Sequence, residues 1–107
     1  MVEIGDEVPP TIPDNLMIVF PNPTYGDFRV EITRPLLENS NLRIITPNGQ
    51  IVYQRPITDY DRAHIEYFNL GMLLNEGLYI IDVIENGQRA GHVHLLVAGS
   101  PGVLTMK

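Results

Sequence analysis

The sequence contains no cysteine and no tryptophan, and its one lysine is Lys107. Without cysteine, a disulfide framework and a thiolate metal site are both excluded. With seven basic residues and a net charge of −6, the chain lacks the clustered positive charge that nucleic-acid phosphates or an anionic membrane surface attract. No apolar run approaches the ~18 residues of a membrane-spanning helix. These absences predict a protein that binds no nucleic acid and spans no membrane.

Residues that carry catalysis are also scarce. The two serines, Ser40 and Ser100, fall in apparent loops or tails, so nothing supports a serine nucleophile beside a base and an acid. His92 and His94 project from one side of an expected strand and, with Asp82 on the neighbouring strand, are candidate ligands for a divalent metal. A solvated outer sheet face is the better interpretation, because no third strong ligand has motif spacing. We therefore expect no enzyme, no functional metal and no cofactor.

The length of 107 residues fits one domain, and 44% apolar residues is a folding composition. Residues 1–15 hold three prolines and four acidic residues, which predicts an extended linker. This stretch lacks the basic start and apolar core of a signal peptide, so an export signal is expected elsewhere. The domain is expected over 16–97, followed by a tail over 98–107.

The apolar pattern predicts an all-β fold. In the stretch 27–32, Phe28, Val30 and Ile32 alternate with charged residues, which is typical of a half-buried strand. About seven strands spaced 8–12 residues apart indicate an antiparallel β-sandwich. The expected strands cover 16–20, 27–32, 42–46, 51–55, 64–68, 78–84 and 91–97. The expected core residues are Phe28, Val30, Ile32, Ile44, Tyr79, Ile81, Val83, Val93 and Leu95.

Turn residues separate these strands. Asn-Gly at 48–49 and again at 86–87 predicts two hairpins, because both residues tolerate positive φ. Pro21 and Pro23 fix φ and donate no hydrogen bond, so the first strand must end there. Gly26 is expected to supply positive φ, and Gly77 to allow a close backbone approach. Tyr79 is expected to face the core with its hydroxyl at the rim.

Three segments resemble the C-terminal sorting domain (type A) of proteins secreted by the type IX, or Por, secretion system of Gram-negative bacteria. The stretch 20–28 matches an opening Pro-Asn-Pro-x-x-Gly-x-Phe motif, 42–53 resembles a central hairpin with a glycine turn, and 65–79 ends in Gly-Leu-Tyr. The resemblance covers roughly 19–97. The motif residues, with structural or recognition roles, are Pro21, Asn22, Pro23, Gly26, Phe28, Gly49, Gly77 and Tyr79.

The resemblance implies an immunoglobulin-like sandwich at the end of an exported protein. It further implies recognition by an outer-membrane translocon and a cell-surface sortase, with passage through the periplasm to the cell surface or the medium. The alternative is an immunoglobulin-like binding or adhesion module, although no tryptophan is present for a carbohydrate platform. With a single lysine, the strand edges are expected to be poorly protected, which favours recognition at edges and a strand-edge dimer.

Overall fold

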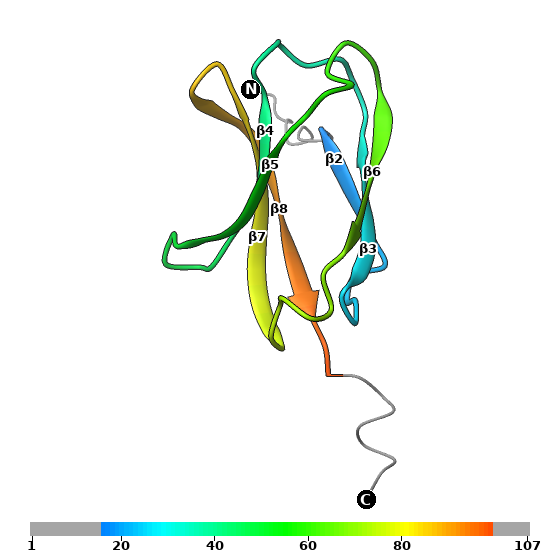
Figure 1. Ribbon diagram of the computed structural model, residues 1–107, viewed down its shortest axis with the longest axis vertical. Helices are drawn as coiled ribbons and strands as arrows, with labels where there is room; N and C mark the ends of the chain where they lie inside the picture. The colour runs from blue at the N-terminus through cyan, green and yellow to red at the C-terminus, as the bar shows by residue number, and fades with distance from the viewer. Residues whose placement is uncertain (1–15, 100–107) are drawn as a thin grey trace, which may run out of the picture.

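The computed structural model describes residues 16–99, which form seven strands in two sheets facing each other (Figure 1). The three-stranded sheet has the order β2-β3-β6, made of Met17–Phe20, Asp27–Ile32 and His64–Asn69. The four-stranded sheet has the order β5-β4-β7-β8, made of Ile51–Pro56, Asn41–Ile45, Gly77–Glu85 and Gln88–Val97. Within the described residues there is no helix, and thus none able to cross a membrane. The predicted linker 1–15 and most of the predicted tail 98–107 lie outside them.

All paired strands are antiparallel, and each expected strand is present with ends shifted by a few residues. The chain makes β2 and β3 in one sheet, crosses to β4 and β5, returns to β6, and ends with the β7–β8 hairpin. Crossing between two aligned antiparallel sheets is the immunoglobulin-like arrangement. The predicted β-sandwich is therefore confirmed.

The core lies between the inner faces of the two sheets. All the residues predicted for it are buried except Val93, which is partly buried and packs against it. Further inward residues of the strands, together with residues of the loops, complete the core. The additional buried residues include Leu16, Met17, Leu36, Leu42, Ile57, Phe68, Leu74 and Val97.

The two predicted hairpins use their Asn-Gly pairs differently. Between β7 and β8, Asn86 and Gly87 both have positive φ (55° and 81°), which is the two-residue turn that the sequence predicts. Between β4 and β5, Gly49 has positive φ (95°) but Asn48 does not. That connection is a longer loop, closed by a hydrogen bond from the Thr46 N–H to the Gln50 carbonyl at 2.9 Å.

Candidate functional site

The loop after β2 runs beside β8, the last strand of the other sheet. Its peptide bonds before Pro21 and Pro23 are both cis. Between them, the side-chain nitrogen of Asn22 donates to the His94 carbonyl at 2.8 Å, and the Asn22 side-chain oxygen accepts from the Leu96 N–H at 3.0 Å. A single side-chain amide thus makes the donor and acceptor contacts that a neighbouring strand would make.

Thr24 extends this contact as a short parallel pairing with β8. The Thr24 N–H donates to the Leu96 carbonyl at 2.9 Å, and the Ala98 N–H donates to the Thr24 carbonyl at 2.7 Å. Together with Asn22, Thr24 therefore pairs the outward backbone groups of β8 from the His94 carbonyl onward. An uncovered edge strand offers such groups to another chain. The expectation of a poorly protected edge is wrong for this stretch, because the opening motif covers it.

Replacing Asn22 by alanine is expected to lower the free energy of unfolding by about 1–2 kcal/mol, since two hydrogen bonds of ~0.5–1.5 kcal/mol each are lost. Asn22→Asp keeps an acceptor for the Leu96 N–H but places a carboxylate oxygen against the His94 carbonyl oxygen, so its loss should be at least as large. Urea denaturation measures both. Asn75→Ala is the matched control, because that exposed side chain makes no hydrogen bond within residues 16–99. Equal losses for Asn22→Ala and Asn75→Ala would contradict the prediction.

Gly26 brings two loops into direct backbone contact. Its φ of +123° confirms the expected positive φ. A Cβ atom placed on Gly26 would lie 2.3 Å from the Cα of Gly71. The Gly26 carbonyl accepts from the Leu70 N–H at 2.8 Å, and the Gly26 N–H donates to the Thr24 hydroxyl at 3.0 Å. The motif glycine therefore joins the β2–β3 loop to the loop after β6.

The remaining motif residues have structural positions. The Phe28 ring stacks on Phe68 with centroids 5.0 Å apart, inside the core. The Tyr79 hydroxyl donates to the Asn75 carbonyl at 2.8 Å, which resembles the tyrosine corner of immunoglobulin-like domains. Gly77 has φ +148°, yet no atom lies within 4 Å of a Cβ placed there. The expected close approach at Gly77 is wrong, and the positive φ is the reason for glycine.

Arg55 joins the two sheets at the lateral edge opposite β8. Its guanidinium donates to the Glu66 carboxylate and to the Tyr67 carbonyl, both at 2.9 Å, and lies 4.0 Å from the centroid of the Phe68 ring. The His64 ring adds a contact to Glu66 at 2.6 Å. The sequence does not reveal this cluster, because Arg55 alternates on β5 like any surface residue. One backbone acceptor on the edge of β6 is thereby occupied.

Asp82 is completely buried beneath two arginines on the outer face of the four-stranded sheet. Arg43 contacts both carboxylate oxygens, at 2.9 and 2.7 Å, and Arg89 contacts one of them at 3.0 and 2.9 Å. Burial by itself raises the pKa of Asp82, but the hydrogen bonds from Arg43 and Arg89 outweigh it and hold the pKa below its ordinary value.

This ion cluster bears on the candidate metal ligands. Asp82 is paired with His92 in the β7–β8 register, as the hypothesis required, and the His92 and His94 rings are 6.1 Å apart. The Asp82 oxygens, however, already accept from the two arginines. Nowhere in residues 16–99 do three histidine, cysteine or acidic side chains gather in a metal-binding group.

The stability of the domain is expected to fall at acid pH. The pKa values of Asp82 and of Glu85, which accepts from Arg34 and the Leu37 N–H, are both lowered in the fold. A lowered carboxyl pKa contributes stability above the unfolded-state value near 4, and this contribution is lost as pH falls through the folded value. Urea denaturation from pH 7 to pH 3 should show it.

Asp82→Asn should have a shallower loss of stability between pH 5 and pH 3 than the wild type. The control is Glu38→Gln, an exposed carboxylate that forms no ion pair in the described chain. This control should follow the wild type. If the stability of Asp82→Asn falls as steeply between pH 5 and pH 3 as that of the wild type, the ion cluster does not contribute to the acid dependence.

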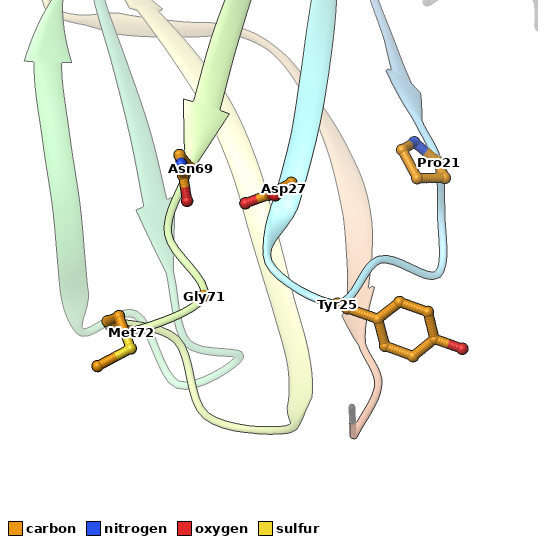
Figure 2. A pocket seen from close by; sticks show the side chains of 6 residues that line it. All are labelled: Pro21, Tyr25, Asp27, Asn69, Gly71 and Met72. Carbon is orange, nitrogen blue, oxygen red and sulfur yellow. The ribbon is translucent and has the colours of Figure 1, made fainter. Parts of the chain in front are cut away.

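An open hollow of about 480 Å³ lies where the β2–β3 loop meets the end of β6 (Figure 2). Asp27 extends toward Asn69 across it, while Tyr25 and Met72 project to opposite sides. A smaller hollow of about 180 Å³ adjoins it and shares Pro21 and Asp27. The larger hollow is lined by Pro21, Tyr25, Asp27, Asn69, Gly71 and Met72.

None of these arrangements resembles a catalytic centre. Ser40, the one serine among residues 16–99, is buried, and its hydroxyl donates to the Leu37 carbonyl at 2.5 Å. The signature residues instead turn the chain, fill the core and close an edge. The fold defines a class of protein: a small antiparallel β-sandwich module.

Comparison with known proteins gives the family. The family model described as "Secretion system C-terminal sorting domain" matches residues 18–97, which is most of the chain. The chain therefore belongs to the type IX secretion C-terminal sorting domain family. This family consists of sorting signals, which are in general non-catalytic and mark exported proteins. No curated protein and no solved structure matched the chain.

Proposed function

We propose that this domain is a non-catalytic export signal, recognised as a folded unit by the outer-membrane translocon and the cell-surface sortase of the type IX system. The observation that carries the proposal is the family match over residues 18–97. The expected route leads through the periplasm to the cell surface or the medium. No cofactor is needed, because the domain acts by being bound.

The structure supports a folded signal. The opening motif is bound to β8, and Gly26 is in contact with Gly71, so the signature residues acquire their geometry only in the folded domain. Most of the signature residues therefore have a structural role in the fold. Recognition then depends on the surface that the motif supports, and not on the motif as a linear sequence.

The test is export of a reporter. A signal peptide, a fluorescent reporter and the full 107-residue chain are joined and expressed in a type IX-competent bacterium, with a translocon-deletion strain and a reporter without the domain as controls. The reporter should reach the surface or the medium only when both the domain and the translocon are present. Retention of a folded fusion in the periplasm of competent cells would contradict the proposal and favour the binding-module alternative.

A further inference from the structure

Parts of two strand edges are already engaged by other groups of the same domain. On β8, Asn22 and Thr24 occupy the outward backbone groups near the end of the strand. On β6, the Tyr67 carbonyl accepts from Arg55, and β5 ends at Pro56, which has no N–H to offer. Recognition by strand addition is thus hindered at these places. At these places a partner would instead contact side chains on a face of the sandwich.

Exposed apolar side chains gather on the outer face of the three-stranded sheet and at its end. Ile18 and Ile65 flank the central strand β3 on this face, and Tyr67, 67% exposed, continues the row. At the end of the sheet, Tyr25 is 59% exposed and Met72 is fully exposed. The outer face of the other sheet also has exposed leucines, Leu78 and Leu96, but the two hollows described above lie on the three-stranded side.

The larger hollow combines these apolar groups with one carboxylate. The Asp27 side chain forms no ion pair or hydrogen bond within the described residues, and neither does the amide of Asn69. The nearest cation along β3, Arg29, lies over the ring of Phe20 at 4.5 Å, outside the larger hollow. Asp27 is therefore the single charged group lining this hollow, and its carboxylate is available to a ligand.

We propose that the hollow binds an extended segment of the secretion machinery in which a lysine or arginine stands beside an apolar residue. The basic group pairs with Asp27, and the apolar neighbours contact Tyr25 on one side and Met72 on the other. Charge complementarity selects this occupant, since the unpaired carboxylate and the net charge of −6 both attract a cation. This inference rests on the proposed function and names the chemistry of the partner.

The position of the hollow connects it with the family motif. Pro21 and Gly71 line it directly, and Gly26 holds the two loops that form its walls. Asn22 and Thr24 anchor the same β2–β3 loop to β8. Apart from Pro21, which lines the hollow, these motif residues shape the site from behind, whereas Asp27, Tyr25 and Met72 contact the partner.

Export of the reporter fusion tests this site in cells. Asp27→Lys reverses the charge in the hollow. The double variant Tyr25→Ser, Met72→Ser removes the large side chains on its two sides. Each is expected to reduce export at least about fivefold, because side chains at the centre of an interface dominate its affinity. The controls are Glu38→Lys and the double variant Leu37→Ser, Leu73→Ser, which make comparable changes of charge and of apolar surface at exposed positions outside the hollow. Thermal unfolding must first show that every variant is folded.

Binding of a defined probe tests the chemistry directly. The probe is the tripeptide N-acetyl-Leu-Lys-Leu-amide, titrated into the full chain and followed by NMR at the backbone amides of Tyr25, Asp27 and Met72. Asp27→Asn should weaken binding about two- to fivefold, the range of an exposed ion pair. N-acetyl-Leu-Glu-Leu-amide should bind more weakly than the lysine peptide.

The outcomes separate the two proposals. If the wild-type fusion is not exported, the proposed function fails. If it is exported and the folded Asp27→Lys and double variants are exported equally well, the hollow is not the recognition site and the sorting function stands. Equal binding of the lysine and glutamate probes, or shifts confined to other residues, would also overturn the inference.

Discussion

Replacing Phe28 by alanine is expected to lower the free energy of unfolding by about 3–5 kcal/mol. The ring is buried on the inner face of β3 and stacks on Phe68, so truncation removes apolar contacts and leaves a cavity between the sheets. Small domains are stable by about 5–15 kcal/mol, so this loss is a large share of the total. Urea denaturation monitored by circular dichroism measures it.

The control for Phe28 is Phe20→Ala on β2. Phe20 is the same residue type in the same sheet, but it lies on the outer face and is partly exposed beneath the guanidinium of Arg29. Its loss should be clearly smaller than that of Phe28→Ala. A loss below about 1 kcal/mol for Phe28→Ala, or equal losses at both sites, would show that the assignment of the core face is wrong.

Gly26→Ala is expected to cost about 2–6 kcal/mol, from two separate effects. The φ of +123° is a strained conformation for alanine, worth about 1–3 kcal/mol. The added methyl group would also lie 2.3 Å from the Cα of Gly71, so the two loops must separate, which adds about 1–3 kcal/mol. Thermal and urea unfolding of the purified chain measure the sum.

Gly49→Ala separates these two effects. Gly49 also has positive φ, at 95°, but nothing lies within 4 Å of a Cβ placed there. Its substitution should therefore incur only the conformational cost. If Gly26→Ala and Gly49→Ala lose the same stability, the contact between the two loops contributes nothing.

The strands could be predicted from the sequence because each is indicated by the alternation of apolar and charged residues within its own stretch of chain. Phe28, Val30 and Ile32 alternate with charged residues, and a period of two places them on one face whatever the rest of the chain does. On β8, the same rule placed Leu95 correctly but was less accurate for Val93, which is only partly buried. A period identifies the inner face of a strand, but not how completely the opposite sheet covers each position.

Turn geometry was predicted only in part. Asn86 and Gly87 both adopt positive φ because Glu85 and Gln88 are paired directly on either side of this two-residue turn, although the register shifts further along, between Val83 and Ile84. Next to the other Asn-Gly pair, the register between β4 and β5 shifts at Ile44 and Ile45, so the connection is longer and Asn48 keeps negative φ. A bulge depends on pairing with the partner strand, which the dipeptide itself does not encode.

The candidate site depended on contacts between distant residues. Asn22 bonds to residues more than 70 positions later, and Asp82 is neutralised by Arg43 and Arg89 from the strands on either side. The sequence marked Asn22 as part of a motif but could not identify its partner. Asp82 was a candidate metal ligand because its contacts with Arg43 and Arg89 cannot be identified from the sequence.

The hydrogen bonds from Asn22 and Thr24 to β8 make the loop after the first strand depend on the last strand of the chain. During synthesis, the opening motif is made long before Leu96 and Ala98, and until then its side-chain amide and backbone groups have no strand to bind. A chain interrupted before β8 would carry every motif residue but lack their arrangement. The folded arrangement of the motif therefore forms only in a chain that has been synthesised through β8.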